Sequence, residues 1–185
     1  MADAVSLCNL ALSSLGAKSI TSLTEDSTAA KECNRVYEHA RDSELRARAQ
    51  VKIAADRVDP IFGAAKRYLK PSDCLRILPT EGQDDSAQQD DFQTYGRYIH
   101  TDNTSPIKLI YVARITDVEQ FDQLFRDLLV RRIASDISEK ITQSNTKREA
   151  ARQEYIAAQK EARRVNAFEK PPQEFPKDSW LKARG

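Results

Sequence analysis

Carboxylates form the densest group of reactive side chains in the sequence, in one segment that contains no basic residue. The acidic residues of that segment are Glu81, Asp84, Asp85, Asp90 and Asp91. A calcium loop needs Asp at alternate positions, a central Gly and a closing Glu, and this segment lacks that spacing. Glycoside hydrolysis needs two opposed carboxylates, and no spacing among the 28 acidic residues singles out a pair. We therefore expect a solvated loop, with an acidic lining that repels passing DNA as the functional alternative.

Histidine and cysteine are too sparse and too widely spaced to predict a metal or catalytic site. The two histidines, His39 and His100, stand in neither a His-Glu-x-x-His nor a Cys-x-x-Cys frame. The three cysteines, Cys8, Cys33 and Cys74, are odd in number and far apart, which favours reduced thiols in a cytoplasm over a disulfide framework. Phosphate-binding glycine loops and a Gly-x-Ser-x-Gly elbow are also missing. We expect no catalytic residue, no metal and no cofactor.

A run of basic residues between positions 147 and 164 could bind nucleic acid. Its members are Lys147, Arg148, Arg152, Lys160, Arg163 and Arg164. Phosphate binding requires a concentrated excess of positive charge, whereas the whole chain carries 29 basic and 28 acidic residues. Acidic and alanine residues are interleaved with this run. A solvated or intersubunit helix face is therefore the favoured interpretation, and nucleic-acid binding is the alternative.

The C-terminal residues 168–185 combine large apolar side chains with prolines. The residues expected to bind a partner are Phe168, Phe175, Trp180, Leu181, Lys182 and Arg184. Three prolines prevent a continuous helix, so the aromatic groups have nothing local to pack against. This pattern indicates a tail that docks on a partner or a neighbouring subunit, with the basic residues steering it toward an acidic surface. The alternatives are a disordered end and, for Phe168, packing back onto the preceding helix.

Apolar periodicity predicts four helices, which must position all these groups. We expect them at about 3–15, 26–56, 117–142 and 146–167, with the second helix turning polar beyond Arg41 and facing solvent or a neighbour. Gly16 suits a helix C-terminus, and Asp117 suits a helix start. Phe125 and Leu128 lie on the densest apolar face and are expected in the core.

Residues 60–115 differ in composition from the predicted helices, because they are richer in prolines, glycines and β-branched residues. Strands are expected at 75–77, 95–100 and 107–115, the last two as a hairpin. The predicted fold class is therefore mainly α, a four-helix bundle with a small inserted antiparallel sheet (α+β). A single domain spans 1–167, and an extended tail spans 168–185. No stretch approaches about 20 apolar residues, so we expect no membrane span.

Several short runs, in this order and spacing, resemble one family of phage proteins. They are 7–12, 15–17, 20–23, 33–37, 71–77, 96–102, 111–117 and 121–125. Together they are similar to the tail tubular protein A, or head-to-tail adaptor, family of short-tailed bacteriophages. The sequence departs from that family at 47–50, where the family often carries a Pro-Trp pair.

The resemblance implies a structural virion protein without catalytic residues. It implies a ring of twelve copies between the portal protein and the tail nozzle protein, forming part of the DNA-exit channel. Contacts with the passing DNA would be transient and non-specific. The protein would be made in the host cytoplasm and reside in the virion tail. A helical nucleic-acid-binding protein and a wall-degrading virion enzyme remain the alternatives.

Overall fold

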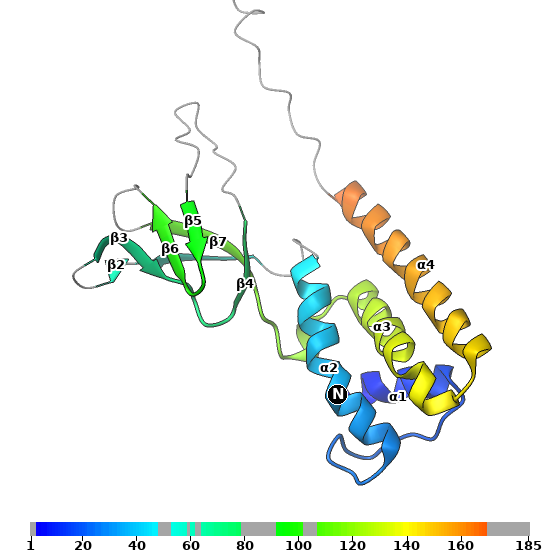
Figure 1. The fold of residues 1–185 in the computed structure, drawn as a ribbon. Helices are drawn as coiled ribbons and strands as arrows, with labels where there is room; N and C mark the ends of the chain where they lie inside the picture. Colours follow the sequence, from blue (N-terminus) through cyan, green and yellow to red (C-terminus); the bar gives the residue numbers. More distant parts are fainter. Residues whose placement is uncertain are drawn as a thin grey trace, which may run out of the picture.

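The computed structural model describes residues 3–47, 53–58, 60–61, 64–78, 92–101 and 107–169. Within these residues the chain forms four α-helices, one short 3-10 helix and seven strands. The helices gather at one end of the molecule and the strands at the other (Figure 1). The fold is therefore α+β, with a helical part and a β part. None of the helices in the described ranges is long and apolar enough to cross a membrane.

The first two helices begin where local capping side chains predict. In α1 (Ala4–Ser14) the side chain of Asp3 accepts a hydrogen bond from the Ser6 amide at 2.7 Å. Gly16 follows with a φ of 71°, the left-handed conformation that glycine adopts without strain. In α2 (Thr28–Ala47) the Ser27 hydroxyl accepts a hydrogen bond from the Ala30 amide at 3.2 Å. Both predicted starts are confirmed.

The third predicted helix is divided into two pieces. Asp117 caps the 3-10 helix η1 (Val118–Gln120), and Asp122 caps α3 (Gln123–Thr142) by accepting a hydrogen bond from the Phe125 amide at 2.7 Å. The start predicted at 117 is therefore corrected to 123, because a second capping carboxylate is available there. The predicted end at Thr142 is confirmed, and Gln143 leaves the helix with a φ of 49°.

The fourth helix is slightly longer than predicted. α4 (Asn145–Glu169) places the backbone of Phe168 inside the helix, so the predicted boundary at 167 is corrected. The nearest downstream proline is Pro171, which disfavours helical backbone only from position 170 onward. The predicted tail from 170 to 185 lies outside the described residues.

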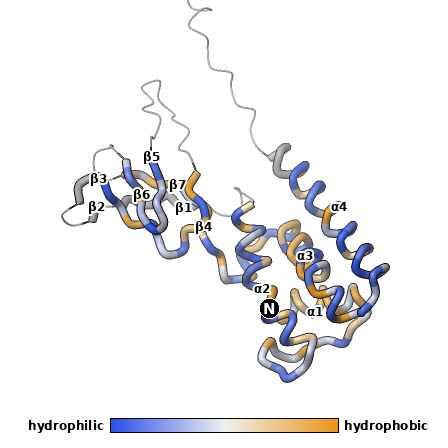
Figure 2. Tube along the Cα trace, viewed as in Figure 1, coloured by the Kyte–Doolittle hydropathy of each residue, from blue (hydrophilic) through white to orange (hydrophobic). Residues whose placement is uncertain are grey.

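α3 is the central helix and packs against α1, α2 and α4. Phe125 and Leu128 are buried, which confirms their predicted place in the core. The rings of Phe121 and Phe125 meet edge to face at 4.8 Å. Hydrophobic positions run along α3, whereas α4 is mostly hydrophilic (Figure 2). α4 therefore offers one narrow side to α3 and the rest of its surface to solvent.

The second helix is much shorter than predicted. It was expected to continue to 56, but it ends at Ala47, and Ile53–Val58 forms strand β1. β1 pairs antiparallel along β7 (Ile107–Ala113), so a non-local ladder outweighs the helix propensity of these alanine-containing residues.

Beyond Arg41, α2 was expected to face solvent or a neighbouring subunit, and the structure contradicts this in part. Arg41, Glu44 and Leu45 are buried within the chain itself, whereas Arg46 and Ala47 are exposed.

The strands form two antiparallel sheets. One has the order β1-β7-β4, where β4 is Cys74–Leu78. The other has the order β2-β3-β6-β5. Its strands are β2 (Pro60–Ile61), β3 (Ala64–Leu69), β5 (Phe92–Tyr95) and β6 (Tyr98–Thr101). The strands predicted at 75–77 and 107–115 are confirmed.

The predicted hairpin between 95–100 and 107–115 is wrong. Gly96 has a φ of 57° and turns the chain between β5 and β6. The segment 95–100, predicted as one strand, therefore contains the turn of a different hairpin and most of β6. β7 pairs instead with β1 and β4.

The β part has a core of its own. Tyr68 and Ile99 from one sheet pack with Leu109 and Tyr111 from the other, in a cluster separate from the helical core. The two parts are joined at the end of α2, where Arg114 donates to Asp42 at 2.8 Å. The partly buried Leu75 of β4 also packs against the helical core. The described chain therefore contains two hydrophobic cores with a small junction between them.

Candidate functional site

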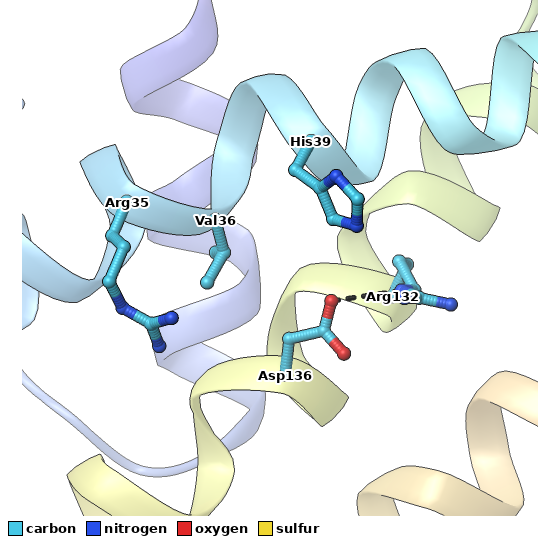
Figure 3. Close-up of a pocket in the computed structure, with 5 residues that line it drawn as sticks. All are labelled: Arg35, Val36, His39, Arg132 and Asp136. Carbon is cyan, nitrogen blue, oxygen red and sulfur yellow. Dashed lines mark hydrogen bonds and ion pairs between the residues drawn. The ribbon is translucent and has the colours of Figure 1, made fainter.

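A polar cleft lies between α2 and α3. Arg35, Val36 and His39 line it from α2, and Arg132 and Asp136 line it from α3 (Figure 3). Its volume is about 380 Å³. Residues four apart in a helix share a face, which brings Arg35 beside His39 and Arg132 beside Asp136.

The positive charges of this cleft are already paired. Arg35 donates to Glu32 at 2.6 Å, and the Nε of Arg132 donates to the Oδ2 of Asp136 at 2.9 Å. His39 is the remaining ionisable side chain that lines the cleft (Figure 3). Because each guanidinium has its own carboxylate, the cleft has little excess charge with which to bind an anion.

A buried polar network adjoins this cleft and connects three helices. The hydroxyl of Tyr155 on α4 donates to Oε1 of Glu44 on α2 at 2.6 Å. Arg132 donates from Nη1 to the Tyr155 oxygen at 3.1 Å, and Gln159 donates to the same oxygen at 3.0 Å. Burial and the hydrogen bond with Glu44 raise the pKa of Tyr155. Glu44 is only 4% exposed, so these partners offset the cost of burying its charge.

This arrangement connects three helices. The Tyr155 hydroxyl donates to the Glu44 carboxylate, and its raised pKa keeps it protonated. No group of three potential metal ligands occurs among the described residues. The network therefore connects α2, α3 and α4 through hydrogen bonds and stabilises their packing.

The cysteines are structural in character as well. Cys8 on α1 and Cys33 on α2 are fully buried, and a hydrogen bond with Cys33 together with burial raises the pKa of the Cys8 thiol. Burial likewise raises the pKa of Cys74. A nucleophilic cysteine needs a lowered pKa and some exposure, and neither Cys8 nor Cys74 has the first. The hydrogen bond with Cys8 lowers the pKa of Cys33, but Cys33 lacks the exposure.

The sequence-predicted site residues are not brought together in the described structure. Glu81, Asp84, Asp85, Asp90 and Asp91 lie outside the described residues, as do the tail residues Phe175, Trp180, Leu181, Lys182 and Arg184. Phe168 is placed only by its backbone, in the last turn of α4. These predictions about side chains therefore stay predictions.

The basic run on α4 is partly used by the fold itself. Arg148 pairs with Glu139 at 3.2 Å, and Lys147 donates to the carbonyl of Leu15 at 3.3 Å. The remaining members are exposed: Arg152, Lys160, Arg163 and Arg164. Part of the run therefore stabilises the helical part.

Sequence reasoning missed the Glu44 network, although one signal pointed to it. The four- and three-residue spacing of Ala151, Tyr155, Ala158, Ala162 and Val165 predicts a narrow seam on this helix, and Ala151 and Ala162 are buried as that spacing requires. A tyrosine in such a seam needs a partner for its hydroxyl. Glu44 gave no signal of its own, because it sits in a polar stretch of α2 that looked solvent-facing.

Comparison with known proteins adds no identification. Protein-family models were searched and none matches the chain, and no curated protein matches it.

Proposed function

We propose that this chain is a ring-forming head-to-tail adaptor of a short-tailed bacteriophage, which joins the portal protein to the tail nozzle and lines part of the DNA-exit channel. In this proposal the four helices act as one bundle and residues 170–185 act as a docking tail. The observation that carries it is the order and spacing of the family-like runs, which coincide with structural units. The runs 7–12 and 15–17 form α1 and its Gly16 turn, and 33–37 lies in α2.

The later runs support the same proposal. Residues 96–101 form the turn after β5 and strand β6, and 111–117 carries the chain from β7 to η1. The run 111–117, which with 121–125 is the most similar to the family, therefore spans the connection between the β part and the helical part. A run that merely repeated a common helix pattern would not be expected to include such a junction.

The distribution of charge on α4 supports a role in assembly. One side of α4 packs on α3, where Ala151 and Ala162 are buried, and its exposed residues include charged side chains of both signs, such as Arg152, Glu154 and Lys160. Arg131 on α3 also reaches Glu154 on α4 at 2.7 Å, so the charges at the edge of this packing are ordered. A mixed-charge surface of this kind suits a polar rim around a subunit contact.

The decisive experiment is electron microscopy of the purified protein mixed with its portal. The adaptor proposal predicts a ring of additional density on the tail-side face of the portal. Absence of binding to portals at micromolar concentration would contradict the proposal, because weak specific complexes still form in that range.

Removal of residues 170–185 tests the docking tail and preserves all of α4. We expect unchanged helical content and melting temperature, with weaker attachment to portals, because Phe175, Trp180 and Leu181 are removed as anchors. Trp180→Ala should reproduce much of the loss, and Gln173→Ala is the matched control in the same segment. Equal portal affinity of the truncated and full chains would refute the docking role.

One observation favours nucleic-acid binding as the second candidate. Four residues of α4, Arg152, Lys160, Arg163 and Arg164, are exposed on a helix that projects beyond the others (Figure 1). A gel shift with duplex DNA at increasing salt tests it, since affinity from phosphate contacts falls steeply with salt. Binding that is lost in Arg152→Glu together with Arg163→Glu would favour this candidate.

A further inference from the structure

The outer face of the β2-β3-β6-β5 sheet carries aromatic and basic side chains. Directly paired residues of antiparallel strands point to the same face, and alternate residues point to opposite faces. Tyr68 and Ile99 are each 1% exposed and form the inner face. The outer face is therefore made by the neighbouring positions, and Leu69 and Tyr95 are exposed there.

The pairing places two rows of side chains across this outer face. Leu69 of β3 pairs with Tyr98 of β6, which pairs with Tyr95 of β5. The second row follows the same order of strands and contains Arg67, His100 and Gln93. We call these six residues the outer face.

Contacts within the outer face hold its rings in place. The Arg67 guanidinium lies 3.8 Å from the centre of the Tyr98 ring, and the rings of Tyr95 and His100 meet edge to face at 5.4 Å. The Tyr95 hydroxyl donates to the side-chain oxygen of Gln93 at 2.6 Å. Side chains that are ordered in advance lose less entropy when a partner binds.

Among the described residues, the strands that form the outer face carry basic side chains. Residues 67–70 and 93–101 contain Arg67, Lys70, Arg97 and His100 and no acidic residue. Arg97 is exposed on the turn after Gly96, and Lys70 donates to the Gly96 carbonyl at 2.9 Å. Tyr and Arg are the residue types that most often dominate binding energy at protein interfaces.

An acidic surface occurs elsewhere on the same chain, at the junction of β7 and α3. Residues 117–127 contain Arg126 and four exposed carboxylates. The carboxylates are Asp117, Glu119, Asp122 and Asp127. We call these four residues the acidic corner. Because it belongs to the start of α3 and the outer face belongs to the far sheet, the two surfaces can join different copies of the chain.

We propose that the outer face of one copy binds the acidic corner of the next copy, as the repeating contact of a ring. This proposal rests on the adaptor function proposed above, which requires assembly of identical chains. A contact between two different surfaces of the same chain is heterologous, and it closes into a ring when its rotation divides a full turn. The opposite charges steer the encounter, and the ordered Tyr and Arg side chains fill the contact.

The chemistry of the outer face favours a protein partner over nucleic acid. Single-stranded nucleic acid needs open aromatic faces on which bases stack. Arg67 already covers one face of Tyr98, and Tyr95 is packed against His100. The formal net charge of +1 also means that the basic outer face is balanced by acidic surface on the same chain.

The test is charge reversal on each side, with the full chain. The face variant is Arg67→Glu with Arg97→Glu, and the corner variant is Glu119→Lys with Asp127→Lys, which leaves both capping aspartates intact. Self-association is measured by sedimentation velocity from micromolar to millimolar concentration, at low and high salt. Each variant alone should associate roughly tenfold or more weakly than the original chain. A mixture of the two variants should recover association, because every contact then joins opposite charges.

Matched controls separate this effect from general changes of charge. Lys18→Glu and Glu38→Lys reverse exposed charges in the connector after α1 and on α2, and they should leave self-association unchanged. Unchanged circular dichroism and melting establish that each variant is folded. If a charge-reversal variant is not folded, the milder variant Arg97→Gln or Glu119→Gln replaces it. Each milder variant should also weaken self-association.

Several outcomes would overturn the proposal. The original chain could fail to self-associate at every concentration, or the two variants could self-associate as strongly as the original chain. Failure of the mixed variants to recover self-association would also contradict the proposal. A face variant that loses binding of a single-stranded oligonucleotide but keeps its self-association would assign the surface to nucleic acid instead. Portal binding separates the two proposals. If the chain binds portals but its self-association is insensitive to these charge reversals, the adaptor function stands and the proposed contact is refuted. If self-association is sensitive to the charge reversals but the chain does not bind portals, the proposed contact stands and the adaptor function is refuted.

Discussion

A buried carboxylate at the centre of the helical part shows how individual residues stabilise this protein. Glu44 is 4% exposed, and it accepts its short hydrogen bond from Tyr155 rather than from a cation. Arg132 lies 4.0 Å away from it and donates to Asp136 and Tyr155 instead. The positive charge is therefore shared between two acidic residues. Removal of the tyrosine hydroxyl would leave Glu44 without its closest partner.

Tyr155→Phe should lower the free energy of unfolding by about 1–3 kcal/mol at neutral pH, the usual cost of leaving a buried polar group without its hydrogen bond. Chemical denaturation followed by circular dichroism measures it. Glu44→Gln is the matched variant, because a glutamine oxygen still accepts from Tyr155, and it should cost less. A Tyr155→Phe variant as stable as the original chain would show that water replaces the hydroxyl.

Tyr37 predicts how stability depends on alkaline pH. Burial raises its pKa to about 12, and its hydroxyl has no hydrogen-bond partner among the described residues. The folded pKa lies above the unfolded value of about 10, so its contribution is fully present below pH 10 and is lost as pH rises toward 12. Tyr155 shifts in the same direction.

Tyr37→Phe should therefore be as stable as the original chain at pH 7, or more stable by up to about 1 kcal/mol, because an unpaired buried hydroxyl is removed. Between pH 9 and 11, at roughly the point where tyrosine begins to ionise, the variant should lose less stability than the original chain. Denaturant titrations at several pH values measure both. Equal alkaline losses in the two proteins would mean that Tyr37 does not ionise on unfolding in this range.

Element boundaries were predictable where the signal was local. Asp3, Ser27 and Gly16 mark helix ends through hydrogen bonds or backbone conformations within a few residues, and each does so in the structure. The second helix failed because its end depends on a distant strand. Nothing near 53 reveals that β7, more than fifty residues later, pairs with it. The turn at Gly96 was visible in the sequence but was misassigned to the interior of a strand.

The candidate site shows the same limit. The basic residues and the seam tyrosine of α4 were identified from the sequence, but their partners on α2 and α3 were not. Glu44 and Tyr155 are 111 residues apart, so only the packing of the helices brings them together. The outer face likewise depends on the register of three strands, which periodicity alone does not supply.

Truncation of a core side chain of α3 tests the packing of the helical part. Phe125→Ala should lower the free energy of unfolding by about 2–5 kcal/mol, because a fully buried ring is replaced by a cavity. Leu10→Ala is the control, since Leu10 is 59% exposed on α1, and it should change stability by less than about 0.5 kcal/mol. Thermal and chemical denaturation measure both. A loss under about 1 kcal/mol for Phe125→Ala would mean that this part of α3 is not core.

The molecule as a whole consists of two packed regions with separate cores. The helical core includes residues of α1, α2 and α3, whereas the β core is built from β3, β6 and β7. Their junction contains the Asp42–Arg114 ion pair, in which the Arg114 side chain is 43% exposed, and the partly buried Leu75. We expect so small a junction to transmit little free energy from one core to the other. In the proposed ring, a subunit built this way would be able to adjust the angle between its two parts.

Two truncations, one in each core, test whether the regions open independently. Ile99→Ala removes a side chain of the β core that is 1% exposed, and Ile133→Ala removes a fully buried side chain of α3. Hydrogen exchange measured by mass spectrometry should rise in β3, β6 and β7 for the first variant and stay unchanged in α1 and α3. The second variant should raise exchange in the helices and leave the β core protected, because local opening follows the contacts that each residue makes. Increased exchange throughout the chain in either variant would show that the two cores unfold as one cooperative unit.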